Sequence, residues 1–164
     1  MSKRIGIISD THGCWDDKYE TYLGDCDEIW HAGDIGTTEL ADQFEAMRPV
    51  FRAVCGDLRR RYPERLRFKC EDVDVLIKHI GGYPGHYDRS VFSSLVAMPP
   101  KLFVAGHSHI LKVQYDRTLG MLHINPGAAG MQGWHVDRTL VRLTIDGDKM
   151  SDCEVITLND RKQR

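Results

Sequence analysis

Five short apolar segments of the chain each run into a polar turn that carries aspartate or histidine. A short apolar run that ends in such a turn predicts a buried β-strand. The predicted strands lie at residues 3–9, 28–32, 50–54, 73–78 and 102–105. A helix is expected over 37–47, because its apolar residues recur at helical spacing. Strand, turn, helix and strand in this order indicate an α/β sheet with crossover helices.

The middle and the end of the chain follow a different pattern. Residues 65–70 alternate charged and apolar side chains, which predicts a strand with one wet face that pairs with 73–78. Residues 81–85 are expected to form a loop and 90–97 a helix that two prolines stop. Two hairpins are predicted later, with turns near 118–120 and 146–147.

Length and composition indicate one globular domain. The chain has 164 residues, of which 41% are hydrophobic and 28% are charged, and this is enough apolar content for a buried core. We expect the domain to span residues 1–158, followed by a polar tail at 159–164. The net charge of −2 argues against a protein dedicated to duplex nucleic acid.

The expected location is the cytoplasm. No apolar run has the length of a signal-peptide core or of a membrane span, so no membrane association is expected. The five cysteines are odd in number and show no CxxC spacing, which favours reduced thiols.

The polar residues at the predicted strand ends carry the information about function. Ligands bind at the carboxyl ends of strands in open α/β sheets, so these residues should converge on one crevice. They are Asp10, His12, Asp34, Asp57, His79, His107 and His109. Nitrogen and oxygen ligands without thiolates suit divalent Mn, Fe, Co, Ni or Zn. Seven ligands are about right for two ions that share a carboxylate, an arrangement suited to in-line displacement at phosphorus.

The motifs in chain order are Asp10-Thr11-His12, Gly33-Asp34, Gly56-Asp57, His79 and Gly106-His107-Ser108-His109. In this order they resemble the motifs of the calcineurin-like metallophosphoesterases. The chain looks most similar to the small single-domain prokaryotic phosphodiesterase branch, which also carries an Asn-Pro-Gly segment like that at 125–127. The resemblance implies a four-layer αββα sandwich of two mixed sheets flanked by helices. It also implies two divalent metal ions, with Mn²⁺ as the first choice.

The resemblance further implies a role for each matching residue. The ligands of the first metal would be Asp10, His12, Asp34 and His109. The ligands of the second metal would be Asp34 as a bridge, His79, His107 and Asp57. His107 and His109 are also the candidates for polarising a phosphate oxygen of the substrate.

The stretch at 56–59 departs from the family pattern. Asp57 stands where asparagine is usual, which adds a negative charge beside the second metal. Arg59 stands where an acid is usual, and we interpret it as a catalytic clamp on a phosphate oxygen, alone or with Arg60 and Arg61. Leu58 occupies the position that is a proton-donating histidine in some relatives, and leucine cannot donate a proton.

Three further histidines, His31, His123 and His135, are interpreted as structural. His31 lies inside a predicted strand next to a motif and is expected to be a core or supporting residue. His123 falls in a predicted hairpin strand, and His135 follows Trp134. Neither is expected to take part in metal binding.

The expected function is a phosphodiesterase or phosphatase in which metal-bound hydroxide attacks a small phosphate ester in line. The alternative is a non-catalytic scaffold for protein binding, because the metallophosphoesterase-like retromer subunit uses the fold in this way. The altered stretch at 56–59 keeps this alternative open. A nuclease for long DNA is disfavoured, because the chain lacks a basic face. Small members of the family often self-associate, so a homo-oligomer is a further expectation.

Overall fold

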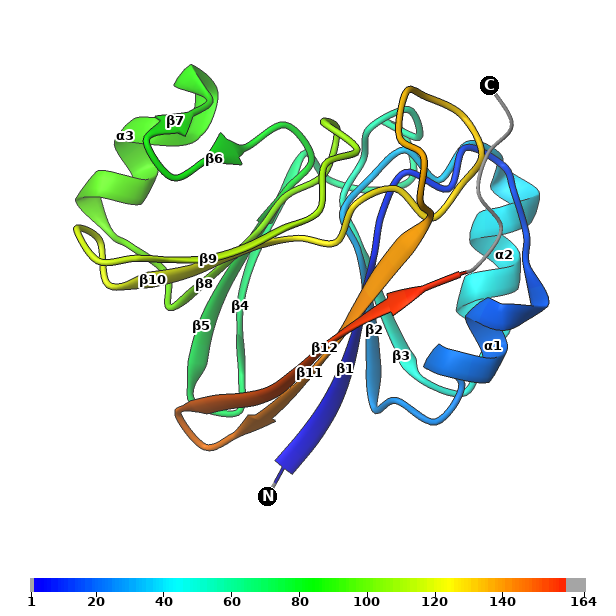
Figure 1. The fold of residues 1–164 in the computed structure, drawn as a ribbon, viewed down its shortest axis with the longest axis horizontal. Coiled ribbons are helices and arrows are strands. Elements are labelled where there is room, and N and C mark those ends of the chain that lie inside the picture. The colour runs from blue at the N-terminus through cyan, green and yellow to red at the C-terminus, as the bar shows by residue number, and fades with distance from the viewer. Residues whose placement is uncertain (1, 159–164) are drawn as a thin grey trace.

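Two β-sheets stack face to face, and helices cover their outer faces, so the molecule is an αββα sandwich (Figure 1). The computed structural model describes residues 2–158. Each of the two stacked sheets has five strands and contains both parallel and antiparallel pairs. The four-layer mixed architecture expected from the resemblance is therefore confirmed. The predicted tail at 159–164 lies outside the described residues.

The first sheet has the strand order β12-β11-β1-β2-β3. Its strands are β1 (Ser2–Ile8), β2 (Glu28–His31), β3 (Val50–Ala53), β11 (Thr139–Asp146) and β12 (Lys149–Thr157). Strands β1, β2 and β3 run parallel, and helices α1 (Asp17–Leu23) and α2 (Thr38–Ala46) connect them. Parallel neighbours need such crossovers, so the βαβ units predicted from the sequence are confirmed.

The second sheet has the strand order β4-β5-β8-β10-β9. Its strands are β4 (Arg65–Cys70), β5 (Val73–Lys78), β8 (Leu102–Val104), β9 (Lys112–Asp116) and β10 (Met121–Asn125). Helix α3 (Arg89–Ala97) connects the parallel strands β5 and β8 and covers the outer face of this sheet (Figure 1). Both late hairpins are present, as β9–β10 and β11–β12.

Strand alternation divides the apolar residues among three layers. In β1, Ile5 and Ile7 are fully buried between the two sheets, whereas Ile8 packs with α1 and α2 on the outer face. In β5, Val75 and Ile77 face the inter-sheet core, and Leu76 packs beneath α3. Successive side chains of a strand point to opposite faces, so strands that are covered on both sides read as continuous apolar runs.

The segment predicted as a loop at 81–85 belongs to a small hairpin instead. Strands β6 (Gly82–Tyr83) and β7 (His86–Tyr87) pair in an antiparallel ladder. The two residues between them are Pro84 and Gly85, and Gly85 has φ +88°. Proline followed by a glycine with positive φ is the pattern of a type II turn, so the punctuating residues close a hairpin here.

The cysteines and the lengths of the helices bear on the environment of the protein. All five cysteines are free thiols in the structure. Within residues 2–158, no helix combines the length and apolar composition that a bilayer crossing requires.

His123 is a buried histidine in the apolar layer beneath α3. Its ring centroid lies 5.4 Å from that of Phe103 and 6.4 Å from that of Tyr87. Burial lowers the pKa of His123 to about 4. The imidazole therefore stays neutral in the folded protein at pH values where an unfolded histidine takes up a proton.

We expect the free energy of unfolding to fall as the pH drops from 6.5 towards 4, because only the unfolded chain is protonated at His123 in this window. The contribution is about 2 kcal/mol between pH 6.5 and 5. His123→Phe should remove it, so the stability gained by the variant over the natural chain should be larger at pH 5 than at pH 7. Urea unfolding with a chelator present measures both differences. Equal differences at the two pH values would contradict the prediction.

Candidate metal centre

The loops that carry the predicted ligands share an unusual backbone conformation. Among the described residues 2–158, seven non-glycine residues have positive φ, and five of them are predicted ligands. Those five are Asp10, His12, Asp34, His107 and His109. A left-handed conformation costs a non-glycine residue roughly 1–2 kcal/mol. The fold therefore holds these loops in a strained shape where the side chains must converge.

The first group of candidate ligands comes from the ends of β1 and β8. One ligand atom from each of Asp10, His12 and His109 lies within 4.8 Å of the others. Oδ1 of Asp10 is 3.2 Å from Nε2 of His109 and 3.7 Å from Nε2 of His12. Its other oxygen, Oδ2, accepts hydrogen bonds from the Ser9 hydroxyl at 2.6 Å and the His107 amide at 3.1 Å. These bonds aim Oδ1 at the two histidines.

The second group comes from the ends of β2, β5 and β8. Ligand atoms of Asp34, His79 and His107 also lie within 4.8 Å of one another. Oδ2 of Asp34 is 3.1 Å from Nε2 of His79 and 3.7 Å from Nε2 of His12, which belongs to the first group. The Asp34 carboxylate therefore lies between the two groups, where a bridging ligand would lie.

A backbone carbonyl orients the ring of His79. Nδ1 of His79 is 2.7 Å from the carbonyl oxygen of Ala32. Because a carbonyl oxygen only accepts, Nδ1 must donate this hydrogen bond. The neutral ring then presents a lone pair on Nε2, on the side that faces Asp34. Histidine ligands of metals are commonly held in this way.

His135 orients His109 through a second histidine contact. Nε2 of His135 lies 2.8 Å from the carbonyl oxygen of Gly130, so it donates there and leaves Nδ1 as an acceptor when the ring is neutral. Nδ1 of His135 is 3.3 Å from Nδ1 of His109. His109 therefore donates from Nδ1 and presents its Nε2 lone pair towards Asp10. The sequence interpretation of His135 as merely structural missed this role.

His135→Phe is expected to lower the affinity for a divalent ion by about 10- to 100-fold, because His109 loses the partner that fixes its tautomer. Competition with a chromogenic chelator measures this affinity. His86→Phe is a matched control, since His86 is exposed on β7 and belongs to neither ligand group. Unchanged affinity in the His135 variant would show that the contact does not prepare His109 for a metal.

The charges of the centre are arranged for a cation. Burial opposes ionisation of Asp10, but the facing rings of His109 and His12 outweigh it and lower the pKa of this carboxyl. The Asp10 carboxylate raises the pKa of His12. Burial acts to lower the pKa of His79, but the carboxylates of Asp34 and Asp10 outweigh this effect and raise it. Positive charge is thus favoured at His12 and His79.

Three buried atoms at the centre test whether a metal fits. Oδ1 of Asp10, Nε2 of His12 and Nε2 of His79 are buried and have no hydrogen-bond partner in the described part of the chain. Buried polar atoms without partners are costly, and here all three face one another. Carboxylate and imidazole donors suit borderline divalent ions. The residues present therefore fit divalent metal ions, and Mn, Fe, Co, Ni and Zn all match the donor type.

His31 joins the loops that carry Asp10, His12 and Asp34. Its Nδ1 accepts the Gly33 amide at 3.0 Å, and its Nε2 lies 3.0 Å from the Thr11 hydroxyl, which donates onward to Ile35. The residue is fully buried, and burial lowers its pKa to about 3. This supporting place matches the prediction that His31 is a core residue.

Residues 56–59, which depart from the family pattern, lie beside the two ligand groups rather than within them. Asp57 is exposed and belongs to neither group, and its Oδ1 accepts a hydrogen bond from the Gly36 amide at 3.3 Å. Leu58 packs against the core beneath α2. Arg59 lines a pocket that also contains His79. Arg61, by contrast, forms ion pairs with Asp42 and Glu45 on α2.

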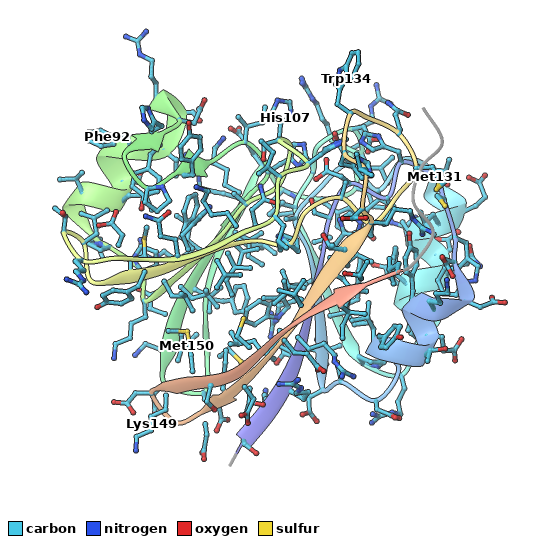
Figure 2. The ribbon with its side chains drawn as sticks, in the orientation of Figure 1. Phe92, His107, Met131, Trp134, Lys149 and Met150 are labelled. Carbon is cyan, nitrogen blue, oxygen red and sulfur yellow. The ribbon has the colours of Figure 1, made fainter. Side chains whose placement is uncertain are left out.

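The predicted Asn-Pro-Gly segment supports the loop of His107 and His109. Asn125 donates from Nδ2 to the Gly106 carbonyl and to the Ser108 hydroxyl, both at 3.1 Å. Its Oδ1 accepts the Gly127 amide at 3.0 Å. Figure 2 shows His107 at the rim of the molecule, on the same side as Trp134.

An αββα sandwich with clustered aspartate and histidine ligands at one rim defines a metallophosphoesterase-type protein. The family comparison agrees, because the model of the calcineurin-like phosphoesterase superfamily domain matches residues 4–148. The chain therefore belongs to the calcineurin-like phosphoesterase superfamily, as the motifs predicted.

Similar proteins include a probable metallophosphoesterase of Methanothermobacter thermautotrophicus. It is 28% identical over 163 residues, which cover 93% of this chain and 91% of that protein. Among solved structures, a novel archaeal phosphodiesterase has a TM-score of 0.71 at 19% identity, covering 94% of this chain and 99% of its own. Vps29 of Entamoeba histolytica in complex with Zn²⁺ has a TM-score of 0.74 at 16% identity, covering 95% and 99%.

Proposed function

We propose that the protein is a phosphodiesterase or phosphatase that hydrolyses a small phosphate ester with two divalent ions, Mn²⁺ being the first choice. One observation carries this proposal. The Asp34 carboxylate lies where the two ligand groups meet, and the buried donor atoms of Asp10, His12 and His79 have no hydrogen-bond partner among residues 2–158. Two ions held in this way are a common solution for displacement at phosphorus.

Each candidate ligand has a place in this proposal. The first ion would be held by Asp10, His12, His109 and one oxygen of Asp34. The second would be held by Asp34, His79, His107 and Asp57, whose side chain would have to leave Gly36 to reach it. Bound ions would supply Lewis acidity and would lower the pKa of a water ligand. His107 is exposed, so it is also placed to contact a phosphate oxygen of the substrate.

We expect residues 56–59 to donate no proton to the leaving group of the substrate. Leu58 is apolar and packs into the core, so nothing at its position can act as a general acid. We therefore expect esters with good leaving groups, such as nitrophenolate, to be hydrolysed faster than alkyl esters. The neighbouring Arg59 would hold a phosphate oxygen of the substrate.

The alternative is a scaffold that binds protein partners without catalysis. It is favoured by the similarity of the fold to Vps29 and by the altered stretch at 56–59. The carboxylates of Asp10 and Asp34 argue against it, because two acids kept close together in a crevice are costly without a cation to neutralise them. We also propose that residues 1–158 form one domain and that the protein acts in the cytoplasm, where its free thiols would persist.

Hydrolysis of bis(4-nitrophenyl) phosphate and 4-nitrophenyl phosphate tests the proposal. Both are assayed with purified protein, with and without Mn²⁺ and with excess chelator, and bound metal is counted by elemental analysis. About two ions per chain and turnover that the chelator abolishes are expected. The absence of turnover with any of the five candidate metals would favour the scaffold instead.

A further inference from the structure

A pocket of about 450 Å³ opens beside the second ligand group. Its wall includes Gly56, Arg59, Tyr62, Lys78, His79 and Ile80. His79 belongs to both the pocket and the ligand group, so the pocket lies beside the second group of candidate ligands. The sequence patterns gave no reason to single out Lys78 among these residues.

Lys78 is a nearly buried cation in this wall. Only 5% of its side chain is exposed, whereas lysine is almost never buried without a partner. Its ammonium group has three donors, and the Ile80 carbonyl accepts one of them at 3.1 Å. Glu64 forms a loose ion pair with Lys78 at 3.7 Å, beyond hydrogen-bond distance, and the Glu64 side chain is 73% exposed. Two donors of the ammonium group thus make no hydrogen bond with the described residues.

Arg59 supplies a second positive charge to the same pocket. Its guanidinium has no hydrogen bond or ion pair with any of the residues 2–158. Arg61, two residues on, is instead bound to Asp42 and Glu45. The cation that can act with Arg59 is therefore Lys78, at the end of β5, because neither Arg60 nor Arg61 lines the pocket.

Tyr62 contributes an aromatic side chain to the same wall. Two cations around one space match a group with several oxygen atoms and a full negative charge. Charge-assisted hydrogen bonds to phosphate are among the strongest in proteins.

We propose that this pocket binds a second phosphate group of the substrate, through Lys78 and Arg59, while the ester to be cleaved lies at the metals. The inference rests on the proposed function and narrows its substrate class. The substrate would be a small phosphodiester that carries an additional terminal phosphate, and Lys78 would determine that preference.

Two chromogenic diesters provide a direct test. Thymidine 5′-(4-nitrophenyl phosphate) and the same compound with a 3′-phosphate have identical scissile bonds and leaving groups. The natural chain should prefer the phosphorylated compound in kcat/KM by about 10- to 100-fold, and Lys78→Met should remove most of this preference. Arg59→Gln should reduce it as well. Lys69→Met is the matched control, because Lys69 is exposed on β4 and should keep the preference.

A binding measurement makes the outcome independent of catalysis. Calorimetry with inorganic pyrophosphate and chelator-treated protein should show binding that is at least about tenfold weaker in Lys78→Met. If no diester is hydrolysed in a metal-dependent way but pyrophosphate binding still depends on Lys78, the proposed function is wrong and the phosphate subsite stands. If hydrolysis is metal-dependent while preference and pyrophosphate affinity are both unchanged in Lys78→Met, the subsite is wrong and the function stands.

Discussion

Replacement of Asp34 by asparagine is expected to lower metal-dependent phosphodiester hydrolysis by about a thousandfold or more. The Asp34 carboxylate is the group that lies between His79 and His12, and thus between the two ligand groups. An amide of the same size removes the negative charge and one of the two equivalent oxygens. We then expect the two proposed ions to bind more weakly, so that the pair of ions no longer holds a water molecule and the substrate together.

Elemental analysis and kinetics at saturating Mn²⁺ together measure this effect. Asp148→Asn removes the same charge from the exposed β11–β12 hairpin and should leave metal content and turnover unchanged. Full activity of Asp34→Asn with two bound ions would show that the carboxylate does not link the two groups.

A single methyl group at Gly56 is expected to have the second largest effect. A Cβ atom at Gly56 would overlap Oδ1 of Asp34 and crowd its backbone amide. The carboxylate would have to move, since the backbone of Asp34 is hydrogen-bonded to the loop of His12. We expect Gly56→Ala to lower hydrolysis by about a hundredfold and to weaken binding of the second ion.

Gly85→Ala separates this steric effect from a general effect of replacing glycine. Nothing lies within 4 Å of a Cβ at Gly85, although its φ of +88° makes alanine strained there. This control should lose about 1 kcal/mol of stability and keep its metal content. If Gly56→Ala binds two ions with normal affinity, the close approach to Asp34 has no consequence for the centre.

The strand ends could be predicted because buried strands appear in the sequence as apolar runs, and the candidate ligands appear as aspartate and histidine motifs directly after them. Apolar runs showed where β1, β2 and β5 lie, and the motif order showed that Asp10, Asp34 and His79 meet. Because the carboxyl ends of parallel strands meet at one edge of a sheet, the side chains that follow these strands lie close together. The left-handed backbone at the ligands was not predictable, because aspartate and histidine adopt it only where surrounding hydrogen bonds impose it.

Two supporting residues could not be found from the sequence. His135 reaches His109 from a loop 26 positions away, and no periodic pattern sets the course of that loop. Lys78 ends an apolar strand, where a charged residue usually marks the surface, but the pocket beside His79 encloses it. In both cases the decisive information is a contact between distant segments, which a single sequence does not contain.

Anomalous diffraction from crystals grown with Mn²⁺ tests the central claim most directly, since it locates the ions without reference to activity. The account predicts two peaks roughly 3.5–4 Å apart, with Asp34 between them. Asp10, His12 and His109 should contact one peak, and His79 and His107 the other. A single peak, or peaks bound by other side chains, would contradict it.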